Sequence, residues 1–150
     1  MNLDAMVDER LVRFDFDGDT KDEVLHNVAR LLYDAGKIND YEAYVRGLYK
    51  REDEFVTGIG AGIAIPHCKG TCVNEGAFTL VKLKNNIKWG SLDDQPVNFV
   101  IMLAAADMSD DVHLKLLAKL SVKLMDDDFR EGLMSAVCIE DIHTLLKEDL

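Results

Sequence analysis

The sequence predicts an α/β protein with one hydrophobic core, on three observations. The chain has 150 residues, which is the length of one ordinary domain. Its composition, 48% hydrophobic and 30% charged with two prolines, is typical of a globular protein. Segments with strand character alternate along the chain with segments of helical periodicity, which indicates helices that cover a sheet.

The first expected elements are a strand and a capped helix. Residues 11–16 alternate in character and predict a strand, which the turn-like residues 17–19 close. Thr20 and Glu23 have the spacing of a capping box and Gly36 the position of a C-terminal cap, so we expect a helix between them. The apolar face of this helix is expected to consist of Val24, Leu25, Val28, Leu31, Leu32 and Ala35.

A second helix is expected to begin after Asp40 and to end near residues 51–54. Its inward-facing residues are expected to be Tyr41, Tyr44, Val45 and Leu48. Residues 76–83 and 97–105 then predict two strands. The second is a continuous apolar run, which favours one central strand buried on both faces.

The C-terminal third of the chain predicts helices. Residues 109–111, Ser-Asp-Asp, offer N-cap candidates for the first of them. Its apolar positions at helical spacing are Leu114, Leu117, Leu120, Leu124 and Met125. Residues 128–137 and 139–147 predict two further short helices, which complete the chain.

Charge and composition exclude several classes of function. The formal net charge is −11 and the basic residues are scattered, so the protein should repel nucleic acid and anionic lipid and attract a basic protein partner. No apolar run approaches the roughly 18 residues that a membrane span requires, and the N-terminus lacks a leader pattern. We therefore expect a cytoplasmic protein without direct membrane insertion. Its three cysteines, an odd number, are expected to be reduced thiols.

The most informative segment for function is residues 57–67, Thr-Gly-Ile-Gly-Ala-Gly-Ile-Ala-Ile-Pro-His. Pro66 fixes its own φ and favours an extended Ile65, so His67 should leave a short strand at a defined angle. The three glycines permit close approach or positive φ, as a docking surface would need. From these residues alone, His67 is either a placed functional imidazole or a satisfied histidine at a loop corner.

Other site classes fit this segment poorly. The glycines lack the strand-then-helix setting of a dinucleotide fold, and the chain has no Gly-Lys-Thr phosphate loop. His67, Cys68 and Cys72 could form part of a metal site, but the Cys-x₃-Cys spacing has no matching second pair and Cys138 is distant. No serine lies in a nucleophile elbow, which disfavours a serine hydrolase.

The three remaining histidines differ in their expected settings. His26 and His143 are predicted to be surface residues of helices, without a role. His113 falls in the first turn of a predicted helix, where the helix dipole disfavours imidazolium and favours a nearby anion such as phosphate. Spacing alone also permits the simpler interpretation that His113 only occupies a helix start.

Together these residues carry a resemblance to a known family. Residues 51–67, from Arg51-Glu52 through Thr-Gly-Ile-Gly to Ile65-Pro66-His67, resemble the signature of the enzyme IIA domains, fructose–mannitol class (type 2), of the bacterial phosphoenolpyruvate-dependent sugar phosphotransferase system (PTS). Further segments that resemble the family in the same order are 21–36, 87–90, 96–97 and 113–120. The resemblance implies a mixed β-sheet flanked by helices on both faces, with residues 1–150 forming a single domain.

The resemblance also implies a function. Phosphorylated HPr would give its phosphoryl group to His67, a covalent nucleophile, which would pass it to a cysteine of an enzyme IIB domain that supplies the membrane permease IIC. The sugar would be fructose, mannitol or a related one. By the same resemblance Arg51 and His113 would lie beside His67 and stabilise phosphoryl oxygens, and Glu52 is a candidate to orient either group. No metal or organic cofactor is implied.

A second function remains open within the same family. In the nitrogen-related branch, phosphorylation of His67 would switch the affinity for a regulatory partner instead of supplying a permease. The chain departs from the family pattern at Cys68, where a small residue is usual, and in the absence of proline from residues 68–76. These departures bear on the sugar more than on the chemistry.

Overall fold

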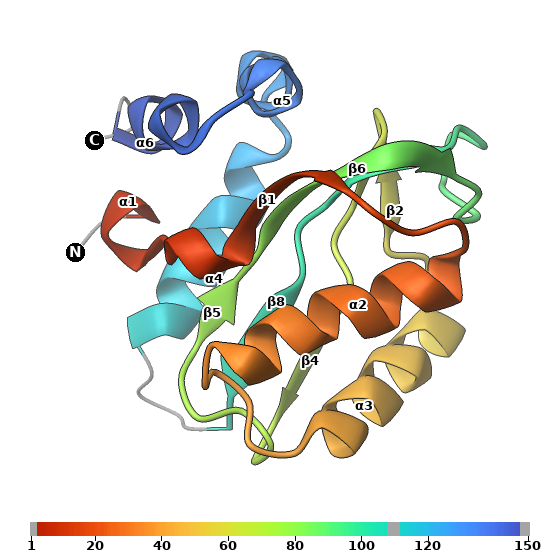
Figure 1. Cartoon of the computed structure of the whole chain (residues 1–150), viewed down its shortest axis with the longest axis vertical. Helices are drawn as coiled ribbons and strands as arrows, with labels where there is room; N and C mark the ends of the chain where they lie inside the picture. The colour runs from red at the N-terminus through yellow and green to blue at the C-terminus, as the bar shows by residue number, and fades with distance from the viewer. Residues whose placement is uncertain (1–2, 108–111, 148–150) are drawn as a thin grey trace.

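The protein has helices on both sides of its strands (Figure 1). The computed structural model describes residues 3–107 and 112–147, and between 112 and 116 it describes the side chain of residue 115 alone. Helices α2 and α3 cover one side of the strands, and α1, α4, α5 and α6 lie on the other (Figure 1). The predicted α/β class with helices on both faces is therefore confirmed, and the strands form two mixed sheets where one was expected.

The larger sheet has five strands in the order β1-β6-β7-β3-β2. They are β1 (Val12–Phe16), β6 (Leu80–Ile87), β7 (Val97–Val100), β3 (Ile63–Ala64) and β2 (Gly58–Gly60). Neighbouring pairs are alternately parallel and antiparallel, beginning with the parallel pair β1 and β6. The smaller sheet has the order β4-β8-β5, in which β8 pairs parallel with β4 and antiparallel with β5. Its strands are β4 (His67–Gly70), β8 (Leu103–Ala106) and β5 (Ala77–Phe78).

Both long strands predicted in the middle of the chain are divided between the two sheets. Thr79 separates β5 from β6, and residues 101–102 separate β7 from β8. At the junction the amide of Thr79 donates to the carbonyl of Met102 at 2.9 Å, and the amide of Met102 donates to Thr79 Oγ1 at 2.9 Å. The prediction of one continuous strand over 97–105 is wrong, because this segment and the segment 77–87 both pass from one sheet to the other here. Its burial on both faces is confirmed, since all but one of residues 97–105 are buried.

Two antiparallel helices cover one side. α2 (Lys21–Asp34) begins at the predicted cap, where Thr20 Oγ1 accepts from the amide of Glu23 at 3.1 Å. α3 (Tyr41–Glu54) begins where Asp40 Oδ1 accepts from the amide of Ala43 at 3.0 Å. The buried residues of the two helices are Val24, Leu25, Val28, Ala29, Leu32, Tyr44, Val45 and Leu48. The predicted inward faces are thus confirmed in their centres, while Tyr41 is only half-buried.

The other side carries the terminal segments. Its helices are α1 (Leu3–Met6), α4 (Val112–Lys123), α5 (Asp127–Ser135) and α6 (Ile139–Lys147). The short helix η1 (Glu9–Leu11) connects α1 to β1 and buries Leu11 among the residues of α2. Leu117, Leu120 and Leu124 are buried as predicted, but Met125 is 80% exposed because the helix ends at Lys123. The expected caps at 109–111 lie outside the described residues. No helix within 3–107 and 112–147 is long and apolar enough to cross a membrane.

Candidate functional site

The glycine-rich segment folds into a tight hairpin that leads to His67. Strands β2 and β3 are antiparallel, and the reversal uses three consecutive residues with positive φ: Gly60 (+100°), Ala61 (+57°) and Gly62 (+81°). A side chain at Gly58 would overlap Ser91, so this glycine permits close approach. Positive φ and close approach, the two properties expected of these glycines, are thus both present, and both serve to form the hairpin.

Pro66 and His67 lie where the chain passes from the larger sheet to the smaller one. The amide of Ile65 donates to the carbonyl of Thr57 at 2.9 Å, and the amide of Leu103 donates to the carbonyl of Pro66 at 3.0 Å. His67 then begins β4, opposite Leu103 of β8. The backbone of this half-buried histidine is therefore held on both sides by hydrogen bonds.

The hydrogen bonds of the His67 ring determine its tautomer. Nδ1 lies 2.8 Å from the carbonyl oxygen of Ile65, which can only accept, so Nδ1 carries the proton. Arg51 Nε lies 3.1 Å from Nε2 and can only donate, so Nε2 accepts. The imidazole is therefore neutral, with its lone pair on Nε2, which is the form that can attack an electrophile.

Arg51 reaches His67 from the last turn of α3. Its Nη1 donates to the carbonyl of Phe55, the C-cap residue of that helix, at 3.2 Å. Its guanidinium carbon lies 5.7 Å from the centre of the Phe55 ring. These contacts hold a permanently charged, planar group beside Nε2, where it can bind the oxygens of a phosphoryl group. The structure thus brings together two of the three predicted site residues, Arg51 and His67.

Glu52 bonds residues other than the histidine that it was expected to orient. Its side chain is 5% exposed and accepts from Thr57 Oγ1 at 2.7 Å, with Lys21 Nζ 3.1 Å away. In the described part of the chain its hydrogen bonds are with these two residues, and none is with Arg51 or His67. The described structure therefore shows no direct contact through which Glu52 would orient either group, because Thr57 and Lys21 bind its carboxylate.

Sequence reasoning missed Thr57 as a residue of the site. Thr57 is 2% exposed and links Glu52 to the indole of Trp89, whose Nε1 donates to Thr57 Oγ1 at 2.9 Å. The available signal was a polar residue at the start of an otherwise apolar, glycine-rich segment. The pattern could not reveal its partners, because Trp89 is 32 residues away along the chain.

A shallow groove opens beside His67. It has a volume of about 330 Å³, and His67 and Ile65 form one wall while Leu117, Ala118 and Ser121 of α4 form the other. Ile65 and Ser121 also line a second groove of about 530 Å³ that continues along α4 toward Ile59 and Met125. Ile59 and Ile65 are thus accessible as expected, whereas Ile63 is buried in the core.

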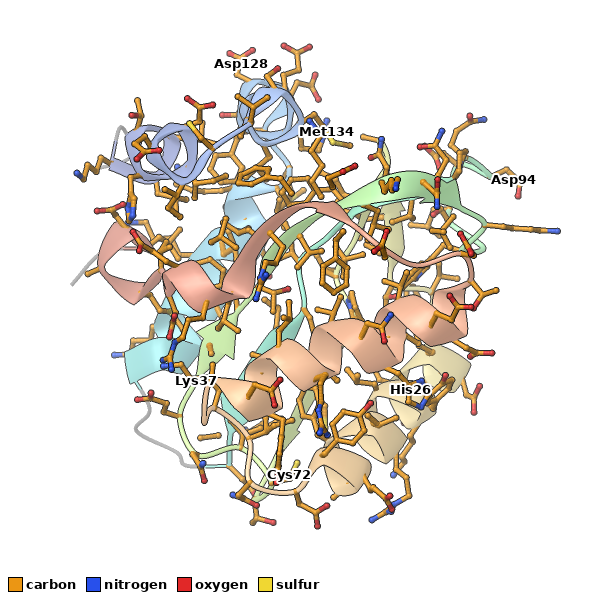
Figure 2. All side chains as sticks on the ribbon, in the orientation of Figure 1. His26, Lys37, Cys72, Asp94, Asp128 and Met134 are labelled. Atoms are coloured by element: carbon orange, nitrogen blue, oxygen red, sulfur yellow. The ribbon has the colours of Figure 1, made fainter. Side chains whose placement is uncertain are left out.

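The other histidines are placed as follows. His113 belongs to the first turn of α4, and its side chain lies outside the described part of the structure, so its contact with His67 stays a prediction. Figure 2 shows His26 at the boundary between α2 and α3, where it is exposed as predicted. His143 is half-buried, with Nδ1 2.5 Å from Asp4 Oδ1, and so joins α6 to α1.

The cysteines beside the site are free thiols. Burial, with a smaller contribution from the neighbouring Cys72, raises the pKa of Cys68 to about 11, so its thiol is protonated at neutral pH. Cys72 lies in the turn after β4 (Figure 2). Among the described residues, no three histidine, cysteine or carboxylate side chains are grouped as a metal site would require.

Comparison with known proteins identifies the family. A model of the family described as phosphoenolpyruvate-dependent sugar phosphotransferase system, EIIA 2, matches residues 5–149. The PTS system fructose-specific EIIA component of Haloferax volcanii is 32% identical over 129 residues, which are 86% of this chain and 84% of that protein. The PTS system fructose-specific EIIABC component of Bacillus subtilis is 34% identical over 136 residues, 91% of this chain but only 21% of that longer protein.

A solved structure agrees with the fold. The nitrogen regulatory protein IIA-Ntr from Neisseria meningitidis matches 96% of this chain and 98% of its own with a TM-score of 0.83 and 22% identity. At that identity the likeness shows the fold alone. The family match over nearly the whole chain, together with the neutral histidine beside Arg51, leads to one assignment: the chain belongs to the EIIA 2 family and is a phosphotransferase component of the phosphoenolpyruvate-dependent sugar phosphotransferase system.

Proposed function

We propose that His67 Nε2 accepts a phosphoryl group from phosphorylated HPr and donates it to a cysteine of an enzyme IIB domain in the cytoplasm. The observation that carries this proposal is the pair of hydrogen bonds on the His67 ring, Nδ1 to the Ile65 carbonyl at 2.8 Å and Arg51 Nε to Nε2 at 3.1 Å. They present a neutral imidazole with its lone pair directed at a fixed cation.

The transfer needs few groups. The Nε2 lone pair attacks phosphorus in line, a new N–P bond forms, and the N–P bond of the donor phosphohistidine breaks, with its electrons passing to the donor imidazole. Because Nδ1 keeps its proton, the phosphorylated ring carries a positive charge that the Ile65 carbonyl stabilises. That charge makes the ring a good leaving group when a cysteine thiolate of enzyme IIB attacks the phosphorus.

Arg51 is proposed to change partners during this step. In the free protein it donates to the lone pair that will attack, and when phosphorus takes that lone pair the guanidinium can turn to the phosphoryl oxygens. His113 is proposed to bind the same oxygens, by the resemblance of residues 113–120 to the family pattern. Its helix, α4, supplies three residues that line the groove beside His67, which supports this proposal.

The names of the relatives favour a transport role with fructose as the sugar. Both the Haloferax and the Bacillus relatives are described as fructose-specific, and the latter as an EIIABC component, which favours IIB and IIC partners for this chain. Residues 1–150 are proposed to act as one enzyme IIA domain that binds its partners briefly through small interfaces. The likeness to IIA-Ntr does not favour the regulatory alternative, because it shows the fold alone.

The test is intact-mass spectrometry after incubation with phosphoenolpyruvate, enzyme I and HPr. We expect one acid-labile phosphate on the parent chain, none on His67→Ala, and one on the matched control His26→Ala, whose histidine is exposed on α2. Addition of an enzyme IIB domain should then remove the phosphate. A parent chain that stays unmodified while HPr is phosphorylated would refute the proposal.

A further inference from the structure

We infer that Thr57 is a positioning residue for phosphoryl transfer, which holds the Ile65 carbonyl that sets the tautomer of His67. This inference rests on the proposed function of His67. Thr57 has no hydrogen bond to the imidazole itself in the described structure, so it acts through the backbone of the hairpin. Its role follows from two separate sets of hydrogen bonds, one from its main chain and one from its side chain.

The main chain of Thr57 acts on the histidine through one residue. Its carbonyl accepts from the amide of Ile65 at 2.9 Å, and the carbonyl of Ile65 accepts from His67 Nδ1 at 2.8 Å. A displacement of Thr57 therefore moves the acceptor that keeps the proton on Nδ1. Without that acceptor the proton can occupy either ring nitrogen, and a proton on Nε2 removes the lone pair that attacks phosphorus.

The side chain of Thr57 fixes its position from two directions. Trp89 Nε1 can only donate, so Thr57 Oγ1 accepts from it at 2.9 Å and directs its own proton to Glu52 Oε1 at 2.7 Å. The hydroxyl of Thr57, a residue that is 2% exposed, thus both accepts and donates a hydrogen bond. Glu52 follows Arg51 directly on α3, so this bond couples the helix that carries Arg51 to the hairpin that carries His67.

Lys21 completes the arrangement electrostatically. Its Nζ lies 3.1 Å from Glu52 Oε1 and 3.3 Å from the carbonyl oxygen of Trp89. It offsets the charge of the carboxylate, which leaves the positive charge of Arg51 available to phosphoryl oxygens. In the described structure Glu52 Oε2 is buried without a hydrogen-bond partner, an arrangement that stability alone does not favour.

The test compares two variants. Thr57→Val removes the hydroxyl and keeps the shape of the side chain, whereas Thr57→Ser keeps the hydroxyl. Tyr41→Phe is the control, since it also removes a partly buried hydroxyl, one that bonds the His26 carbonyl at 3.1 Å from the first turn of α3, ten residues before Arg51. Two quantities are measured. One is the His67 tautomer, by long-range ¹H–¹⁵N correlation NMR of the unphosphorylated protein, and the other is the single-turnover rate of phosphorylation by phospho-HPr.

We expect the parent, Thr57→Ser and Tyr41→Phe to show Nδ1 protonated and Nε2 unprotonated, with similar rates. Thr57→Val should show a mixture of tautomers and a rate lower by about tenfold or more, because small misplacements of a reacting group have large kinetic effects. The inference is overturned if Thr57→Val keeps the parent tautomer and rate, or if Tyr41→Phe changes them equally.

The tautomer measurement separates this inference from the proposed function. It needs no phosphoryl donor, so a parent chain that phospho-HPr fails to modify would refute the relay while the NMR result still decides the role of Thr57. If Thr57→Val does not fold, Trp89→Phe removes one of the two bonds to Oγ1 and keeps a ring in place. A shift of the tautomer in the same direction is then expected, and an unchanged tautomer overturns the inference.

Discussion

Replacement of Arg51 gives the sharpest test of how the site stabilises a phosphoryl group. Its guanidinium nitrogen Nε lies 3.1 Å from His67 Nε2, so a phosphoryl group bonded there has its oxygens within reach of the same cation. Arg51→Ala removes the charge and the donors together. Arg51→Lys keeps a charge but lacks the planar fork that can bond two phosphoryl oxygens at once.

The size of the effect follows from the exposure and the distance. A hydrogen bond to a charged group contributes about 1.5–3 kcal/mol, and the half-buried position of Arg51 favours the upper part of this range, since solvent screens it less. A loss of about 2–3 kcal/mol corresponds to a rate lower by about 30-fold to 150-fold for Arg51→Ala. We expect Arg51→Lys to lie between that value and the parent.

The assay is rapid-quench measurement of phosphoryl transfer from ³²P-labelled HPr at saturating donor and physiological salt. Arg46→Gln is the matched control, because it removes one positive charge from an exposed position of the same helix, α3, where salt screens it. A loss smaller than about threefold for Arg51→Ala, under 1 kcal/mol, would refute the reasoning, as would an equal loss for Arg46→Gln.

Three further predictions concern the residues around the site. Gly58→Ala should lower the free energy of unfolding by about 1–3 kcal/mol in urea titrations, because its Cβ would overlap Ser91 and lie 2.9 Å from the Ser91 Cα. Gly70→Ala, where the added Cβ would have its nearest neighbour at 3.7 Å, should leave the free energy of unfolding unchanged. Equal values for the two variants would contradict this reasoning. Ala61→Asn should stabilise the protein by about 0.5 kcal/mol and so raise its melting temperature, because asparagine tolerates the φ of +57° better than alanine does. A lower melting temperature would contradict this prediction. The pKa of Cys68, near 11, keeps its side chain a thiol at pH 8, so iodoacetamide should modify it about 100-fold more slowly than in the unfolded chain. The rate of modification should rise as the pH approaches 11. Equal rates in the folded and unfolded states would show that the pKa of Cys68 is not raised.

Local signals in the sequence predicted the helices well. The capping box of Thr20 and Glu23 and the cap of Asp40 involve residues three positions apart, and both hydrogen bonds are present in the structure. Periodicity also predicted α5 and α6 to within about two residues, an ordinary uncertainty for helix ends. These elements depend on neighbours along the chain, which a sequence pattern contains.

The sequence by itself determined the alternation of helices and strands, the constrained backbone at Pro66 and the family to which the motif around His67 points. Only the tertiary structure decided that the apolar run 97–105 divides between two sheets, because the division depends on Thr79, which bonds Met102 from 23 residues away. It also decided the tautomer of His67 and the partners of Glu52. Each of these depends on which donor faces which acceptor after the helices pack on the sheets. The spacing of residues along the chain contains no information about these tertiary contacts.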